Sequence, residues 1–138
     1  MYWPWQKKTI PDPELIPITK AEIFELLKPW GITSYELVDR DWVLVPDDYY
    51  RAVALASKVR DKQYIPEKRD CDNFAHSLVE AFNKGKGFIF GSCKGRTKSM
   101  GPHAWCFYIN QDKKVRFVEP QTYGRVDDII SIMSFYTI

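Results

Sequence analysis

Three residues in the second half of the chain, Cys71, His103 and Glu119, are of the types that together perform nucleophilic catalysis. A cysteine attacks as its thiolate, an imidazole takes the thiol proton, and a carboxylate fixes the orientation of the imidazole. The three residues are far apart in the sequence, so the fold has to bring them together. The chemistry therefore depends on the elements that position them.

Cys71 falls at the expected start of a helix. Asp70 is a typical N-cap residue, and a helical pattern covers residues 71–83. In the first turn of a helix, free backbone N–H groups and the positive end of the helix dipole stabilise a thiolate. We therefore expect a depressed pKa for the Cys71 thiol. The alternative is that Cys71 is a small buried hydrophobic residue, as most free cysteines are.

The imidazole and the carboxylate are expected on one β-hairpin. Strand-forming residues cover positions 103–109 and 115–119, and the polar residues 110–112 form the turn between them. His103 then begins the first strand and Glu119 ends the second. Both side chains therefore lie at the same end of the hairpin.

The register of this hairpin follows from its apolar side chains. Placing Trp105 opposite Phe117 gathers the large rings on one face and sets His103 opposite Glu119. The pair is then either the orienting half of a catalytic triad or a structural salt bridge. We expect the Cys71 helix to pack on the Trp105 face, which brings the Cys71 sulfur within hydrogen-bond range of His103.

The remaining histidine and cysteines are expected to have structural positions. His76 is rotated well away from Cys71 on the expected helix and falls on its outer face. Cys106 falls on the strand face opposite His103, in the core, whereas Cys93 falls in an exposed, oxidisable loop. The chain has no CxxC pair and no histidine spacing typical of a zinc site.

The order of the other elements, helices first and strands later, is typical of an α+β fold. The proline-rich residues 1–18 indicate an extended arm held by its tryptophans. Thr19 and Glu22 form a capping box for a helix over residues 21–28, and a second helix runs from Asp47 or Asp48 to about residue 60. Strand segments are expected at residues 35–45, 88–90 and 129–138, and the glycine-rich residues 91–101 are expected to form a loop beside the cleft.

Composition limits the class of protein. The chain has 138 residues, 45% hydrophobic and 28% charged, which suits one globular domain over residues 1–138. The net charge of +2 is too small to indicate nucleic-acid binding. No apolar run is long enough for a membrane helix, and the N-terminus lacks a signal-peptide pattern. We therefore expect a cytoplasmic protein with reduced thiols.

Three motifs carry a resemblance to a known family: DCDNFA at residues 70–75, GPHAW at 101–105 and VEPQT at 118–122. The order of these motifs resembles that of papain-like and transglutaminase-like cysteine enzymes. In detail the motifs are similar to small proteins, many of them from bacteriophages, that are related to the C-terminal protease domain of the Marasmius mushroom agglutinin. The resemblance covers about residues 64–122.

The resemblance implies a papain-like α+β fold, in which the helix bearing the cysteine packs on an antiparallel sheet bearing the histidine and the glutamate. It implies a catalytic core over residues 64–138, preceded by a helical and strand part over residues 19–63. The triad would be Cys71, His103 and Glu119. Gln63 or Tyr64 would take the place of the glutamine that precedes the nucleophile in papain relatives.

The implied function is hydrolysis of a peptide or isopeptide amide in a protein or peptide substrate. The alternatives are a catalytically silent relative that binds a partner in the cleft, and a transglutaminase-type acyl transferase. Calcium activation in the similar family suggests an ion near Asp72, although Asp70 is better explained as a helix cap. A phage-encoded protein of this kind would act in the host cytoplasm. The sequence predicts no oligomeric state.

Overall fold

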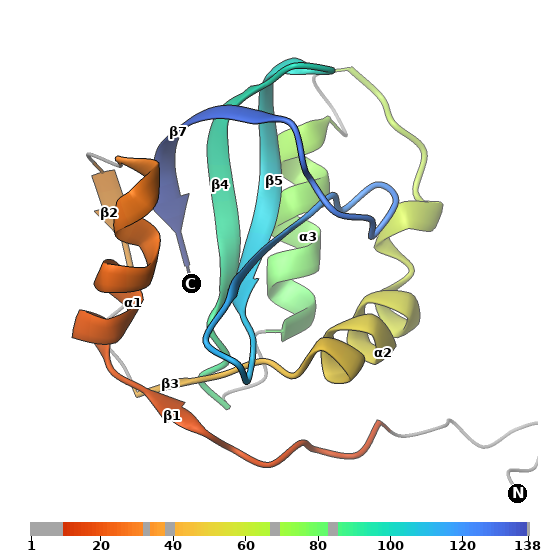
Figure 1. The fold of residues 1–138 in the computed structure, drawn as a ribbon. Coiled ribbons are helices and arrows are strands. Elements are labelled where there is room, and N and C mark those ends of the chain that lie inside the picture. Colours follow the sequence, from red (N-terminus) through yellow and green to blue (C-terminus); the bar gives the residue numbers. More distant parts are fainter. Residues whose placement is uncertain (1–9, 32–33, 38–40, 67–69, 83–85, 138) are drawn as a thin grey trace, which may run out of the picture.

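The computed structural model describes residues 10–31, 34–37, 41–66, 70–82 and 86–137. In these ranges the chain forms an α+β fold (Figure 1). The helices are α1 (Lys20–Leu27), α2 (Asp47–Ser57) and α3 (Cys71–Phe82), with short 3₁₀ helices at Lys28–Trp30 and Val59–Asp61. The strands are β1 (Pro17–Ile18), β2 (Ser34–Glu36), β3 (Trp42–Val43), β4 (Phe90–Thr97), β5 (Gly101–Ile109), β6 (Val115–Val118) and β7 (Ile129–Tyr136).

The main sheet has the strand order β2-β7-β4-β5-β6. Its neighbouring strands are antiparallel except for β2 and β7, which are parallel. β1 and β3 form a separate two-stranded sheet. The expected α+β class is therefore confirmed, and the last strand lies inside the sheet because it pairs with β4 on one side and β2 on the other.

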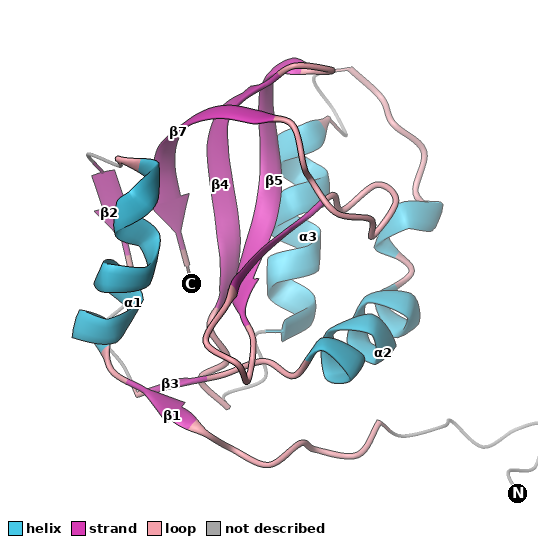
Figure 2. Ribbon diagram, in the orientation of Figure 1, coloured by secondary structure: helices cyan, strands magenta, loops and turns pink. Residues whose placement is uncertain are grey.

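Two apolar cores lie on opposite faces of the main sheet. Figure 2 shows the helices α1 and α3, which contribute to different cores, on different sides of β4 and β5. The alternation of side chains along β5 divides them, since Ala104, Cys106 and Tyr108 belong to one core and Trp105, Phe107 and Ile109 to the other. The first core is closed by α2 and α3, and the second by α1 and β3. Both faces of β5 are therefore buried, which makes it the central strand for both cores.

The helix starts follow the sequence signals. Thr19 and Glu22 form the predicted capping box at α1, with the Glu22 N–H donating to Thr19 Oγ1 at 3.1 Å. At α3, Asp70 and Asn73 cap reciprocally: each backbone N–H donates to the side-chain oxygen of the other, at 3.1 and 3.4 Å. Asp70 is therefore a helix cap, as predicted, and Cys71 occupies the first turn.

The hairpin register differs from the prediction by two residues. Phe107 pairs with Phe117, where the prediction placed Trp105 opposite Phe117. The turn is longer than expected, because Asn110 accepts the backbone N–H of Lys113 and its side chain accepts that of Lys114. A shift of two residues leaves every side chain on its original face.

The side of the sheet on which α3 packs also differs from the prediction. Its buried residues contact the core that contains Ala104, Cys106 and Tyr108, so α3 packs on the face opposite Trp105 and Phe107. The predicted packing on the Trp105 face is therefore wrong. The Trp105 face is already covered by Ile23 and Leu27 of α1 and by Trp42.

The glycine-rich segment expected to be a loop is strand β4 instead. A Cβ atom at Gly91 would lie 2.3 Å from the carbonyl oxygen of Tyr136, and one at Gly95 would lie 2.1 Å from that of Ser131. Both glycines are therefore required by the close approach of β7. Only the turn at residues 98–100 remains of the predicted loop.

The remaining strand predictions are confirmed only in part. Residues 35–45 form no hairpin, because β2 belongs to the main sheet and β3 to the small one. The tryptophans expected to hold the arm lie outside the described residues. None of the helices in the described ranges is long and apolar enough to span a membrane.

Candidate active site

His103 and Glu119 form a direct side-chain pair at the end of the β5–β6 hairpin. His103 Nε2 is hydrogen-bonded to Glu119 Oε1, and the His103 side chain is 3% exposed. The second carboxylate oxygen, Oε2, accepts the backbone N–H of Gln121 at 3.0 Å. The imidazole and the carboxylate are therefore in contact, as predicted. The two residues are diagonal neighbours across the strands, however, whereas the prediction placed them directly opposite each other.

The turn after β6 holds Glu119 in place. The backbone N–H of Glu119 donates to the Gly124 carbonyl at 2.8 Å, and the Glu119 carbonyl accepts the Tyr123 N–H at 2.6 Å. Tyr123 ties this turn to α2 and the segment after it, because its carbonyl accepts the Tyr50 hydroxyl at 3.2 Å and its hydroxyl accepts the Arg60 N–H at 3.0 Å. The carboxylate is thus fixed at the backbone and at both of its oxygens.

Cys71 and His103 line the same cavity, of about 320 Å³. Its other lining residues are Tyr64, Met100, Pro102 and Gln121. The two reactive side chains reach it from different sides of the sheet: Cys71 packs against the Ala104 core, whereas the His103 ring stacks on Trp105 with the ring centroids 6.2 Å apart. Both line this cavity because both lie near the start of β5.

Burial raises the pKa of the Cys71 thiol. The negative charges of Asp72 and Asp70 act in the same direction, while the backbone N–H groups of Ala104 and Asp72 oppose it by hydrogen bonding to the sulfur. The prediction of a lowered pKa is therefore wrong, because the loss of solvation on burial raises the pKa more than the hydrogen bonds from backbone N–H groups lower it. Without a base beside it, this thiol would be mostly protonated at neutral pH.

No hydrogen bond joins the Cys71 thiol to the His103 ring among the side chains that the structure describes, so the expected contact is not formed. Nε2 of the His103 ring is already hydrogen-bonded to the Glu119 carboxylate. Nδ1 is therefore the nitrogen left for the thiol. In cysteine and serine enzymes such hydrogen bonds are often long before a substrate binds.

Of the two predicted oxyanion candidates, Tyr64 and Gln63, Tyr64 alone is among the residues that line the Cys71 cavity. Tyr64 lines the Cys71 cavity, and its ring stacks on Phe74 of α3 with centroids 6.3 Å apart. Gln63 is exposed and does not line this cavity. Sequence reasoning missed Gln121, whose place directly after the Glu119-Pro120 pair was the available signal.

The residues that the structure describes form no metal-binding cluster near Asp72. The Asp72 carboxylate lies 3.9 Å from the Lys94 ammonium, and the Asp70 carboxylate caps α3. In the described part of the chain, no group of three or more His, Cys, Asp or Glu side chains could hold an ion. These residues do not fit the suggested calcium ion, and we assign it no role.

The other thiols and the second histidine are structural. Cys106 is buried and donates to the Ala75 carbonyl at 3.4 Å, as expected of a core residue. Cys93 was expected in an exposed loop but is 1% exposed on β4, so that prediction is wrong. Burial raises the pKa of both thiols well above its usual range. His76 lies on the outer face of α3, as predicted, and stacks on Tyr136.

A second cavity, of about 170 Å³, is also lined by His103. It shares Met100 and His103 with the Cys71 cavity, and its wall includes Glu119, Thr122 and Arg125. The His103 side chain therefore lines two separate cavities.

Comparison with known proteins places the fold beside two solved mushroom-lectin structures. Neither a protein-family model nor a curated protein sequence matches the chain. A structure described as a PSL1a–E64 complex is similar with a TM-score of 0.71 and 21% identity, over 87% of this chain and 51% of that one.

The second structure is Polyporus squamosus lectin bound to the human-type influenza-binding epitope Neu5Acα2-6Galβ1-4GlcNAc. It is similar with a TM-score of 0.64 and 26% identity, over 76% of this chain and 43% of that one. The chain thus spans about half of the length of the first of these structures and less than half of the second. The likeness shows that this α+β arrangement is also used as one part of longer proteins.

Proposed function

We propose that this protein is a papain-like cysteine hydrolase that cleaves a peptide or isopeptide amide through Cys71, His103 and Glu119. The observation that carries the proposal is the hydrogen-bonded pair of the buried His103 and the half-buried Glu119, beside a cavity that Cys71 also lines. The three residue types have the chemistry of a thiol nucleophile, a base and an orienting carboxylate. The overall likeness to PSL1a, whose structure contains E64, supports the same interpretation.

In the proposed reaction His103 first accepts the Cys71 proton at Nδ1, because Nε2 is held by Glu119. The thiolate then attacks the carbonyl carbon of the amide and forms a tetrahedral intermediate. Collapse of this intermediate breaks the C–N bond, and His103 gives its proton to the leaving amine. Water, deprotonated by His103, then hydrolyses the thioester and releases the carboxylic acid.

The developing oxyanion needs hydrogen-bond donors near the sulfur. The backbone N–H of Cys71 lies in the first turn of α3, where such groups have no partner within the helix. The Tyr64 hydroxyl and the Gln121 amide belong to side chains that line the same cavity. We propose these three groups as the oxyanion donors, with Gln63 excluded by its position.

The test uses E64, an epoxide that alkylates thiols. We expect one equivalent of E64 on the wild-type protein, mapped to Cys71 by mass spectrometry, and none on Cys71→Ala. His103→Ala should be labelled far more slowly, whereas His76→Ala is the matched control and should be labelled at the wild-type rate. Absence of labelling in the folded wild-type protein would contradict the proposal.

The same experiment separates the alternatives. A silent relative that binds a partner in the cleft would show no labelling and no cleavage of a peptide library. An acyl transferase would be labelled but would incorporate a primary amine into a glutamine-containing peptide faster than it hydrolyses it. Binding of the sialylated trisaccharide without labelling would favour a glycan-binding role like that of the second neighbour.

A further inference from the structure

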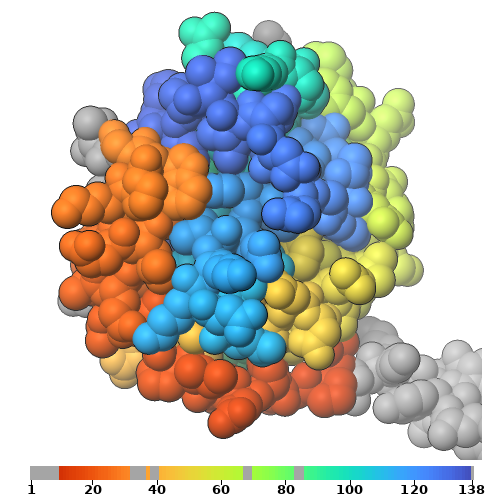
Figure 3. Space-filling model, in the orientation of Figure 1, coloured from red at the N-terminus to blue at the C-terminus, as the bar shows by residue number. Residues whose placement is uncertain are grey.

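The described structure also holds a cavity larger than the one beside Cys71. It has a volume of about 490 Å³ and lies between α2, β6 and the turn that follows β6. Figure 3 shows this part of the surface, where the hairpin (light blue) lies beside α2 (yellow). Its size is within the roughly 300–1,000 Å³ typical of small-molecule sites.

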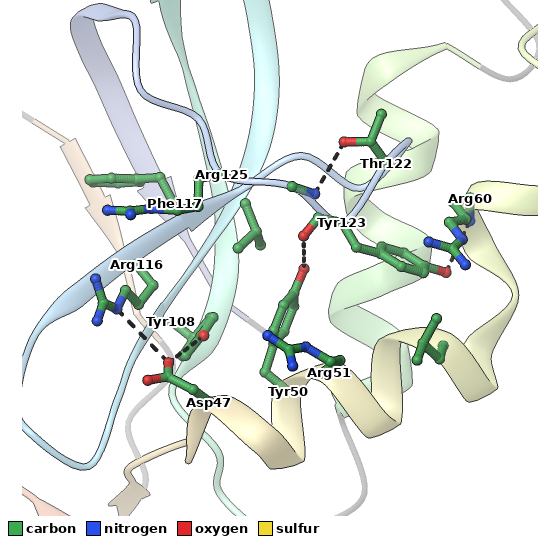
Figure 4. A pocket seen from close by; sticks show the side chains of 13 residues that line it. Asp47, Tyr50, Arg51, Arg60, Tyr108, Arg116, Phe117, Thr122, Tyr123 and Arg125 are labelled. Atoms are coloured by element: carbon green, nitrogen blue, oxygen red, sulfur yellow. Dashed lines mark hydrogen bonds and ion pairs between the residues drawn. The ribbon is translucent and has the colours of Figure 1, made fainter.

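The charged side chains that line this cavity are mostly arginines. Arg51 extends from α2, Arg60 from the segment after it, Arg116 from β6 and Arg125 from the chain beyond the turn (Figure 4). Asp47 is the one acidic residue among the lining residues. Four arginines from separate elements therefore line a hollow whose lining includes a single acidic residue.

Asp47 does not neutralise this cluster. Its Oδ1 accepts the Tyr108 hydroxyl at 2.6 Å and its Oδ2 accepts the Asn110 amide at 3.1 Å. Arg116 approaches the same carboxylate only to 3.9 Å. The hydrogen-bonding capacity of Asp47 is thus directed mainly to Tyr108 and Asn110, which leaves most of the N–H donors of Arg116 available.

The other arginines are also weakly engaged. Arg60 lies 4.0 Å from Asp61 and Arg125 lies 3.8 Å from Asp127, both as exposed pairs of the kind that contribute little. The Arg51 side chain is exposed on α2 and makes no hydrogen bond or ion pair with another side chain of the described ranges. The guanidinium groups therefore keep planar N–H donors that suit the oxygens of carboxylates and phosphates.

The floor of the cavity is rigid. The Tyr50 hydroxyl donates to the Tyr123 carbonyl at 3.2 Å, and the Tyr123 ring lies under the Arg60 guanidinium at 5.0 Å. Tyr50 and Tyr108 stack with their ring centroids 4.8 Å apart. The tyrosine hydroxyls are therefore already hydrogen-bonded within the protein. The arginine side chains are the polar groups left to contact a ligand above the tyrosine rings.

We propose that this cavity binds a small ligand with more than one anionic group, carboxylate or phosphate, held by Arg51, Arg60, Arg116 and Arg125. This site does not depend on the proposed hydrolysis, since it shares none of the three catalytic residues. Arg125 and Thr122 also line the cavity beside Glu119, so a bound anion would lie next to the catalytic pair.

The test is calorimetric titration of the purified protein with inorganic pyrophosphate and, separately, with citrate, at constant ionic strength. We expect saturable binding of at least one probe with a stoichiometry of one. Arg51→Gln and Arg116→Gln should each weaken it by about tenfold, the effect of removing one charge-assisted contact. The tighter of the two probes identifies phosphate or carboxylate as the ligand group.

Arg96→Gln is the matched control, because Arg96 is exposed on β4 outside the cavity and its loss changes the net charge equally. It should bind both probes with wild-type affinity. The proposal is overturned if neither probe gives saturable heat, or if Arg96→Gln weakens binding as much as the cavity variants. Melting temperatures of all variants verify that each is folded.

Discussion

Replacing Glu119 by glutamine tests the central geometry without knowledge of the substrate. Glutamine has the same shape, so its side chain can still accept the Gln121 N–H that now meets Oε2. The change removes the negative charge beside the buried His103 ring. An amide N–H₂ turned toward Nε2 would also favour the wrong tautomer for a base that acts through Nδ1.

The magnitude follows from the contact that is lost. A hydrogen bond to a charged group contributes about 1.5–3 kcal/mol, and about 1.4 kcal/mol corresponds to a factor of ten. Because burial raises the pKa of Cys71, the reactive thiolate depends on proton transfer to His103. We therefore expect Glu119→Gln to lower the reactive fraction, and hence the alkylation rate at neutral pH, by about ten- to a hundredfold.

The assay is the rate of Cys71 alkylation by iodoacetamide, followed by intact mass. Cys93 and Cys106 are buried and should not interfere in the folded protein. Glu80→Gln, an exposed change on α3, is the control and should react at the wild-type rate. In a His103→Ala background, Glu119→Gln should cause no further loss, since the carboxylate acts only through the ring.

A folded Glu119→Gln protein that alkylates at the wild-type rate would refute this reasoning. So would an equal loss with and without His103, because the carboxylate would then act on the thiol by another route.

Three further predictions concern pH, packing and metal. In His103→Ala the alkylation rate of Cys71 should rise about tenfold per pH unit from neutral pH to beyond the ordinary thiol pKa of about 8.5, because burial raises the pKa of this thiol; a plateau below pH 8 would contradict that direction. Gly95→Ala should lower the free energy of unfolding in urea by about 3 kcal/mol, because the new methyl group meets the Ser131 carbonyl, whereas Gly124→Ala, whose nearest neighbour is at 3.3 Å, should cost under about 1 kcal/mol. Calcium should leave the melting temperature unchanged, and a rise that is lost in Asp72→Asn would show an ion site that the described residues do not reveal.

Sequence patterns predicted the local elements of the site well. The cap at Asp70, the helix start at Cys71 and the proximity of His103 to Glu119 at one end of the hairpin all depend on short-range signals: a capping residue, a helical period and an alternating hairpin. The prediction that the two residues lie directly opposite each other was wrong, because they are diagonal neighbours. The two-residue error in register did not separate His103 from Glu119, because side chains in a strand repeat with a period of two.

Long-range packing could not be predicted in the same way. The two faces of β5 are both apolar, so nothing in the strand itself indicates which face α3 covers and which face α1 covers. Gly91 and Gly95 looked like loop residues because the carbonyls that exclude a side chain there come from β7, far along the sequence. The pKa of Cys71 was misjudged for the same reason, since its desolvation comes from the tertiary fold.

The placement of Cys71 and His103 on different cores has a consequence for the folding chain. A partly folded protein in which only the α3 core had formed would hold Cys71 beside β5, but the Trp105 ring on which His103 stacks would lack its cover from α1. Under the proposed function, full activity would therefore require both cores, because the α3 core positions the thiol and the α1 core supports the ring that acts as its base.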